Sequence, residues 1–172
     1  MDCKYLQVFI LISSYNKQDR IVTVLQRVTA VEVPEVEFEM IVIDDDSSDD
    51  TVKIFEKNPQ LYSELVRRDR HGGKCAAVRV GPNKATGDYI KFQDADLEHN
   101  PSEYRTLAHP VLKKNDDAVI GSQNLAANYV SEHYFWHLLG NGLNNLIFNL
   151  LYNLTFTDIY SCYLLYRRDL IA

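Results

Sequence analysis

The chain has 172 residues, of which 46% are hydrophobic and 24% charged, and its formal net charge is −6 at pH 7. These values are typical of a soluble globular protein with one core, and the acidic balance argues against a nucleic-acid partner, which would require a basic face. Cys3, Cys75 and Cys162 are odd in number and widely spaced, which argues against a disulfide framework or a zinc site and favours a reducing compartment.

The sequence predicts neither a signal peptide nor a membrane span. The first apolar run, Val8 to Ile12, is too short for a signal peptide and lacks a cleavage site. No run reaches the roughly 18 apolar residues that a membrane-spanning helix needs. We therefore expect a cytoplasmic protein.

Apolar runs alternate with amphipathic segments in a βαβα order, which is typical of a mostly parallel sheet with helices on both faces. The sequence predicts strands at Val8–Ser13, Phe38–Asp44, Glu64–Arg68, Tyr89–Gln93 and Ala118–Gly121. It predicts helices at Asp19–Val31, Asp50–Lys57, Gly73–Ala85, Ser102–Lys113 and Glu132–Leu154. The expected fold class is α/β with three layers (α/β/α), in a single domain over residues 1–172. A new segment starts at Tyr160 shortly before the chain ends, so we expect either a compact core or a C-terminal truncation.

The first acidic cluster, 44–50, follows the second expected strand. Carboxylates repel one another, so such a cluster costs stability unless a cation or a donor-rich ligand neutralises it. In open α/β sheets, ligands bind beyond the carboxyl ends of the strands. We expect Asp44 or Asp45 to accept hydrogen bonds from a base or ribose, and Asp49 or Asp50 to cap the following helix.

The segment from Arg70 to Lys74, which contains Gly72 and Gly73, precedes the third expected helix. Glycines at a helix entrance allow a phosphate to approach, and a lysine adds a point charge. A Walker A loop is excluded, because Arg68 and Cys75 stand where it needs glycine and Ser or Thr. The segment therefore indicates a phosphate or nucleotide contact at Lys74.

The second acidic cluster, Asp94-Ala95-Asp96, follows the fourth expected strand. Two carboxylates one residue apart on an extended chain project in the same direction, and the small Ala95 lets a ligand approach the backbone. Oxygen ligands at this place suit a hard divalent cation that carries a nucleotide diphosphate. The alternative is a solvated turn at the end of a strand. The sequence favours a site for a nucleotide-activated substrate.

The long expected helix, Glu132–Leu154, has two distinct faces. One face is an apolar stripe at helical spacing, formed by Leu139, Leu143, Leu146, Ile147, Leu150, Leu151 and Leu154. The other carries a row of asparagines at every fourth position, formed by Asn141, Asn145, Asn149 and Asn153. Two interpretations stay open: a core helix with a polar solvent face, or a helix at a membrane surface or lipid groove.

Taken in order, five segments of the chain resemble glycosyltransferase family 2 of the GT-A fold. Within that family they look closest to the dolichyl- and polyprenyl-phosphate sugar transferases. The five segments are Ile12–Asn16, Ile43–Thr51, Gly72–Ala77, Ala85–Glu98 with its Asp-Ala-Asp-Leu signature, and Thr157–Tyr163. The resemblance spans nearly the whole chain and implies a GT-A (Rossmann-like) fold.

For the donor side, the resemblance implies a metal-dependent, inverting transfer from a UDP- or GDP-sugar. The implied nucleotide-sugar contacts are Ser14, Tyr15, Asn16, Asp44, Asp45, Lys74, Asp94 and Ala95. The implied metal ligands, for Mg²⁺ or Mn²⁺, are Asp94 and Asp96. The sugar and the base stay open.

For the acceptor side, the resemblance implies Asp158 as the catalytic base or acceptor-positioning carboxylate. Gln123, Arg167 and Arg168 are the other expected contacts. A sugar or protein hydroxyl must lose its proton as it attacks, so a carboxylate helps, whereas a lipid phosphate is already anionic. We expect a polyprenyl or dolichyl phosphate acceptor and peripheral contact with the cytoplasmic face of a membrane. A hydroxyl acceptor stays open.

The chain departs from the family pattern at five positions: 13, 17, 46, 123 and 164. Ser13 replaces a proline, Lys17 a glutamate, Asp46 a glycine, Gln123 an arginine and Leu164 a basic residue. Because of these changes, a second interpretation stays open, in which the chain is a relative of the family that binds a nucleotide without catalysing transfer. A sugar-nucleotidyltransferase is disfavoured, because no Gly-rich loop with Arg and Lys follows the first strand.

Overall fold

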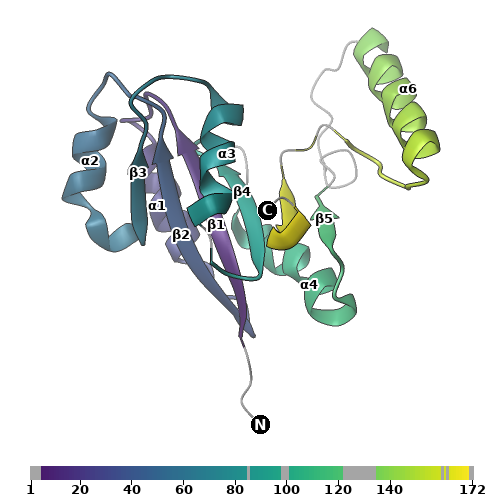
Figure 1. Cartoon of the computed structure of the whole chain (residues 1–172), viewed down its shortest axis with the longest axis horizontal. Coiled ribbons are helices and arrows are strands. Elements are labelled where there is room, and N and C mark those ends of the chain that lie inside the picture. The colour runs from purple at the N-terminus through teal and green to yellow at the C-terminus, as the bar shows by residue number, and fades with distance from the viewer. Residues whose placement is uncertain are drawn as a thin grey trace.

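The computed structural model describes residues 5–84, 86–97, 101–121, 135–159, 161 and 163–170. Its centre is a six-stranded sheet in the order β3-β2-β1-β4-β6-β5 (Figure 1). The strands are β1 (Leu6–Ser14), β2 (Val36–Asp44), β3 (Glu64–Arg67), β4 (Tyr89–Asp94), β5 (Ala118–Ile120) and β6 (Leu164–Arg167). Strands β1 to β4 run parallel, whereas β6 is antiparallel to both of its neighbours. The α/β class and the mostly parallel sheet predicted from the sequence are confirmed.

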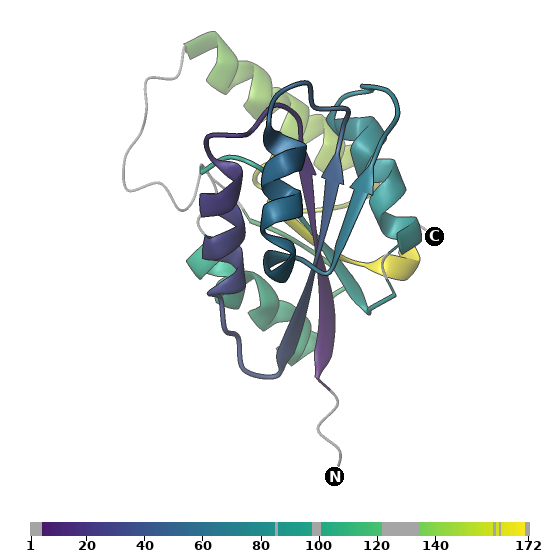
Figure 2. The same ribbon diagram turned by 90° about the vertical axis from the view of Figure 1, so that its left-hand side faces the viewer.

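Helices cover both faces of the sheet, because the side chains of β1 alternate between two apolar cores. One core joins Val8, Ile10 and Ile12 to helices α1 (Ile21–Thr29), α2 (Thr51–Lys57) and α4 (Tyr104–Lys114). Phe9 and Leu11 belong to the other core, on the face where α3 (Lys74–Lys84) contacts β1. Figure 2 shows α1 and α4 on one side of the strands and α3 on the other. The fold therefore has three layers.

Gly81 allows α3 to lie close to the sheet. A Cβ atom placed on Gly81 would be 2.3 Å from Cδ1 of Leu11, a separation that side-chain atoms do not tolerate. Since α3 starts at Lys74, this close packing also fixes where the lysine enters the site at the other end of the helix.

Helix α6 (Phe135–Tyr152) extends away from the sheet (Figure 1). Its apolar stripe is exposed, with Leu143 at 55% and both Leu150 and Leu151 at 74% relative exposure. The interpretation of this segment as a core helix is therefore wrong, because the asparagine face, rather than the leucine face, contacts the chain that follows. Among the described helices, none combines the length and the hydropathy needed to span a bilayer.

Strand β6 and three short 3-10 turns were not predicted. The turns are Pro59–Leu61, Pro101–Glu103 and Arg168–Leu170. The turn at Pro101 replaces the first turn of the expected helix, which begins as α4 at Tyr104. Ala85 and residues 132–134, at the ends of two expected helices, lie outside the described residues, as do Cys3 and Cys162.

Candidate functional site

The carboxyl ends of β1 and β4 and the loop after β2 border a hollow of about 410 Å³. The residues that line it are Ser13, Ser14, Tyr15, Lys17, Asp45, His71, Gly73, Lys74, Asp94, Ala95 and Asp96. The structure thus brings together six of the predicted nucleotide contacts and both predicted metal ligands. Gln123 lies outside the described residues.

Ser14 and Asp44 are neighbours across the β1–β2 pairing, at the last position of each strand. Their side chains are only 2% and 1% exposed. Oδ2 of Asp44 accepts a hydrogen bond from the backbone N–H of Ser47 at 3.0 Å. Oγ of Ser14 and Oδ1 of Asp44 have no hydrogen-bond partner among the described residues. Buried polar atoms without partners are rare and costly, so this pair indicates a place where a ligand supplies the missing groups.

Asn16 joins the turn after β1 to the acidic loop. It has a positive φ of 51°, which asparagine tolerates better than most residues. Its side-chain Oδ1 accepts a hydrogen bond from the Ser48 N–H at 2.9 Å, and its own N–H donates to Oγ of Ser47 at 3.0 Å. Asp46 in the same loop has a φ of 66°, so the position where the family has glycine does adopt the left-handed conformation. The side-chain amide of Asn16 therefore shapes the loop.

Asp45 organises the glycine loop. Its carboxylate accepts hydrogen bonds from the N–H groups of Gly73 at 2.7 Å and Gly72 at 3.2 Å, and it pairs with Arg68 and with Nδ1 of His71. Burial alone would raise the pKa of Asp45, but the two glycine amides and Arg68 together hold it below its usual value. The amides of the two glycines expected to let a phosphate approach are therefore directed at a carboxylate of the protein itself.

His71 is a site residue that the sequence analysis did not single out. Its ring stacks on Tyr15, with the ring centroids 4.0 Å apart and the planes inclined by 28°. Both side chains are exposed enough to meet a ligand, at 50% for His71 and 40% for Tyr15. The position of His71 directly before Gly72 and Gly73 was the one sequence signal that could have suggested a role for it in the site.

Lys74 and Asp94 form an ion pair at the mouth of the hollow. Nζ of Lys74 is 2.5 Å from Oδ1 and 2.7 Å from Oδ2 of Asp94. Asp96 lines the same hollow, and Ala95 between them is 2% exposed. In the described part of the chain, no three His, Cys, Asp or Glu side chains gather as a metal-binding group. Two carboxylates fit a hard divalent cation only if diphosphate oxygens and water complete its ligands.

A buried polar cluster forms around Lys91, in the same strand as Asp94. Lys91 is 1% exposed, and its Nζ donates to the Phe92 carbonyl at 2.7 Å and to Oε1 of Gln93 at 3.1 Å. The same Nζ lies 4.5 Å from the ring centre of Tyr104 and 4.2 Å from that of Tyr163. Burial lowers the pKa of Lys91 to about 7. The sequence analysis missed this cluster, because a lysine inside a strand gives no signal of burial.

The acceptor-side residues are divided between two places. Asp158, 9% exposed, follows α6, and it does not line the hollow at β4. The register pairs Arg167 with Tyr89 at the start of β4, so it lies at the end of the sheet opposite Asp94. There it pairs with Asp117 and Asp169, and the backbone N–H of Arg168 donates to the Asp88 carbonyl. The structure does not bring the two arginines to the acidic site, because β6 runs antiparallel to β4.

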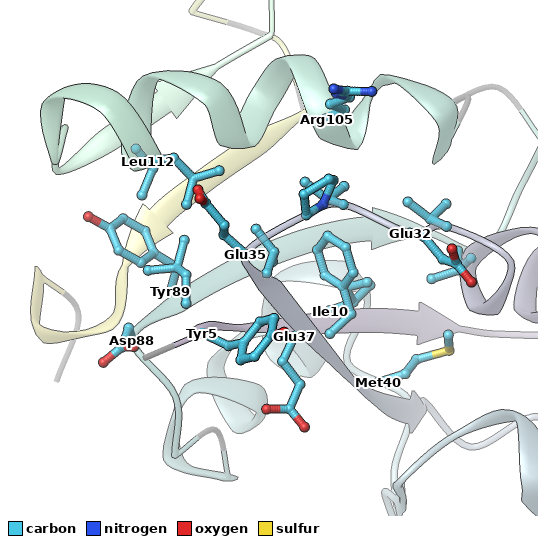
Figure 3. Close-up of a pocket in the computed structure, with 18 of the residues that line it drawn as sticks. Tyr5, Ile10, Glu32, Glu35, Glu37, Met40, Asp88, Tyr89, Arg105 and Leu112 are labelled. Carbon is cyan, nitrogen blue, oxygen red and sulfur yellow. The ribbon is translucent and has the colours of Figure 1, made fainter. Parts of the chain in front are cut away.

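A larger hollow of about 1620 Å³ lies at that opposite end (Figure 3). Side chains around it include Tyr5, Glu35, Asp88 and Arg105, at the start of β1, β2 and β4 and on α4. Its apolar walls and scattered charges differ from the acidic pair and lysine at the other end. Ligands of parallel α/β sheets bind beyond the carboxyl ends of the strands, so the smaller hollow is the candidate site.

Sequence comparison supports the family resemblance found in the sequence. The family described as Glycosyl transferase family 2 matches residues 9–172. Over 138 residues the chain is 30% identical to the dolichol-phosphate mannosyltransferase of Pyrococcus furiosus, covering 78% of this chain and 38% of that protein. Over 117 residues it is 31% identical to the undecaprenyl-phosphate 4-deoxy-4-formamido-L-arabinose transferase of Yersinia pestis, covering 66% of this chain and 36% of that protein. The chain thus spans less than two fifths of the length of these relatives.

Solved structures share the architecture. One is glucosyl-3-phosphoglycerate synthase from Mycobacterium tuberculosis, solved with Mn²⁺, uridine diphosphate and glucosyl-3-phosphoglycerate. It matches 96% of this chain and 58% of its own at 19% identity, with a TM-score of 0.69. S. aureus TarS matches 96% of this chain and 48% of its own at 21% identity, with a TM-score of 0.66. These likenesses show the GT-A fold.

Proposed function

The chain belongs to glycosyl transferase family 2, and on that premise we propose that it moves a sugar from a UDP- or GDP-sugar to a polyprenyl phosphate with the help of Mg²⁺ or Mn²⁺. The observation that carries the proposal is a hollow lined by Ser14, two carboxylates and a lysine. Asp44 lies next to Ser14 in the sheet, and each of the two side chains has a buried oxygen without a hydrogen-bond partner among the described residues. The Ser14–Asp44 pair, the two carboxylates and the lysine match, in turn, a base, a metal-bound diphosphate and a phosphate oxygen.

Ser14 and Asp44 favour a base that presents an N–H next to a carbonyl. The Asp44 carboxylate needs a donor, and the Ser14 hydroxyl can donate to an acceptor beside it. Uracil and guanine both carry such an N–H and carbonyl pair, whereas adenine and cytosine do not. The exposed Tyr15 ring would stack on the base, with His71 as its present stacking partner.

Asp94, Asp96 and Lys74 would hold the diphosphate. A divalent cation on the two carboxylates supplies charge neutralisation for the leaving diphosphate when it is bound. Lys74 is already at Asp94, so it can move to a phosphate oxygen with a small change of side-chain torsion. Because Asp45 keeps the Gly72 and Gly73 amides occupied, the lysine is the contact that this loop offers to phosphate.

The acceptor proposal rests on α6 and the segment after it. From residue 133 to residue 157 the sequence contains no Asp, Glu, Lys or Arg, and the leucine stripe of α6 is exposed. An exposed apolar helix face of this kind suits a lipid chain or a membrane surface. Asp158 directly follows this uncharged stretch, where it would orient the acceptor or accept its proton.

A hydroxyl acceptor is the second candidate. Arg167 and Arg168, the two cations expected on the acceptor side, lie at the end of the sheet opposite Asp94. Asp158 would then act as the base that takes the hydroxyl proton. Transfer assays with undecaprenyl phosphate and with free sugars as acceptors would separate the two.

Calorimetry tests the donor proposal directly. UDP and GDP should bind with Mn²⁺ present, CDP and ADP should bind much more weakly, and EDTA should lower the UDP or GDP affinity. Asp44→Asn should relax the discrimination against CDP, because an amide can donate where the carboxylate only accepts. Equal affinity for all four nucleotides would refute the role of the Ser14–Asp44 pair.

A further inference from the structure

Two asparagines of α6 hold the backbone of the segment that contains Asp158. Asn149 accepts a hydrogen bond from the Phe156 N–H at 2.9 Å and donates to the Phe156 carbonyl at 2.8 Å. Asn145, one turn earlier, donates to the Thr157 carbonyl at 2.9 Å and accepts from the Ile159 N–H at 3.1 Å. Each side-chain amide therefore satisfies one donor and one acceptor of the backbone, as the edge of a neighbouring strand would.

The bonds of Asn145 bracket Asp158. One goes to the residue before it and the other to the residue after it, so the backbone on both sides of Asp158 is fixed to α6. The ring of Phe156 also lies near Phe148 of the helix, with centroids 6.2 Å apart. Asp158 is consequently positioned by the polar face of the helix whose apolar face is exposed.

Ending the helix does not require these bonds. Asn153 follows the last helical residue with a φ of 52°, and the Leu154 N–H donates to the Asn149 carbonyl at 3.0 Å. A left-handed residue with such a backbone bond is a common and sufficient helix stop. Asn145 lies two turns upstream of this stop, so its side-chain bonds serve the segment at Asp158.

We propose that Asn145 and Asn149 are positioning residues that fasten Asp158 to α6. This inference rests on the proposed role of Asp158 on the acceptor side. Helix α6 would then place both reacting partners: an acceptor bound along its exposed face, and the Asp158 carboxylate that meets this acceptor. A displacement of α6 carries Asp158 with it, while the donor groups on β1, β2 and β4 stay fixed.

The test compares Asn145→Ala with Asn141→Ala, which removes the same side chain one turn earlier in the same row. Transfer is measured from UDP-glucose and GDP-mannose to undecaprenyl phosphate in detergent. We expect Asn145→Ala to lower kcat by about 10-fold or more, since small misplacements of a reacting group are costly. The donor KM of Asn145→Ala should be close to that of the wild type. Asn141→Ala should have a kcat close to that of the wild type. An Asn145→Ala enzyme with wild-type kcat would overturn the inference.

A double variant separates positioning from general loosening. If Asn145 acts through Asp158, Asn145→Ala should have no further effect in the Asp158→Asn background. If Asn145→Ala lowers kcat as much in the Asp158→Asn background as in the wild type, the inference is refuted. A wild-type rate for Asp158→Asn would instead refute the proposed role of Asp158.

If the wild-type protein transfers neither sugar, the proposed donor and acceptor fail, and amide hydrogen exchange decides the inference. Asn145→Ala should then speed exchange at Ile159, and Asn149→Ala should speed it at Phe156, while Asn141→Ala changes neither. Unchanged exchange at Ile159 and Phe156 would show that the asparagines do not hold the segment.

Discussion

Lys74 and Asp94 are paired directly, with Nζ 2.5 Å from Oδ1, at the place where the chain offers two carboxylates to a cation. In the proposed donor site, the ammonium group and a divalent metal would therefore compete for Asp94 when no diphosphate is bound. On this proposal, binding of a metal-diphosphate complex would resolve the competition, because the phosphate oxygens would give the lysine a new partner.

Lys74→Met should strengthen binding of Mn²⁺ alone and weaken binding of UDP or GDP in the presence of Mn²⁺. The first effect follows from freeing Asp94, and the second from losing a phosphate contact. Asp96→Ala should abolish the metal dependence of nucleotide binding altogether. Calorimetric titrations with Mn²⁺ and with EDTA measure both changes, and an unaltered metal dependence in Asp96→Ala would contradict the assignment.

Asp49 should stabilise the start of α2. Its Oδ1 accepts a hydrogen bond from the Thr51 N–H at 3.0 Å, and Oδ2 accepts one from the Gln18 N–H at 3.3 Å. Asp49→Ala should lower the free energy of unfolding by about 1 kcal/mol, the usual effect of a lost cap. Asp50→Ala is the matched control, because Asp50 makes no side-chain capping bond and pairs instead with the exposed Lys53. Urea unfolding that ranks the two variants in the opposite order would refute this.

Lys91 should make stability depend on pH. Burial lowers its pKa from 10.5 to about 7 in the folded state. Between these values the unfolded chain binds more protons than the folded one, so the free energy of unfolding should rise as pH increases from about 7 towards 10. Below about pH 7 both states are protonated, and this contribution is constant.

Lys91→Met keeps the length of the side chain and removes the titrating group, so the rise in stability with pH should become shallower. Urea unfolding at several pH values between about 6 and 9.5 measures this slope. Identical slopes for the variant and the wild type would show that Lys91 does not titrate differently in the two states.

The exposed face of α6 should retain the protein on lipid vesicles. Leu150→Ser and Leu151→Ser combined should lower co-sedimentation with anionic liposomes, since both leucines are 74% exposed. The melting temperature should change little, because these side chains contribute little to the core. Phe148→Ser would be a poorer choice, since Phe148 packs near Phe156 and Tyr152. Equal co-sedimentation of variant and wild type would argue against a lipid-facing surface.

Asp158→Asn should keep nucleotide affinity and lower transfer by about 10²-fold if the carboxylate takes the proton of a hydroxyl acceptor. With undecaprenyl phosphate, which is already anionic, the loss should be smaller but still measurable, because Asp158 would then only orient the acceptor. Comparing the two acceptor classes in the same variant therefore reports the acceptor chemistry.

The parts of the fold that depend on local pattern were predictable. The five expected strands agree with β1 to β5 to within two residues at each end, because buried strands and their turns are local features. Asp94, Ala95 and Asp96 were identified for the same reason, since a strand followed by paired acids is visible in the sequence. The metal-binding role of Asp94 and Asp96 and the nucleotide contact of Ala95 stay predictions.

Features that depend on long-range contacts were not predictable. Arg167 and Arg168 were expected near the acceptor, but β6 pairs antiparallel with β4 and carries them to the other end of the sheet. For the leucine stripe of α6, the sequence left a core helix and a lipid-facing helix open, because periodicity shows amphipathicity and does not show which face is covered. The nucleotide contact of Asp45 stays a prediction, but its hydrogen bonds with Gly72 and Gly73 join residues 27 and 28 positions apart and left no local signal.

The contact of Asp45 with Gly72 and Gly73 also has a consequence for how quickly the proposed nucleotide donor would bind. A glycine-rich loop without a partner would sample many conformations, and a ligand would lose affinity and time in selecting one of them. Here the Asp45 carboxylate accepts the hydrogen bonds of the Gly72 and Gly73 amides, so the loop is restrained by the protein itself without a nucleotide. Association should therefore follow a single exponential whose rate rises linearly with nucleotide concentration, without a slow unimolecular phase.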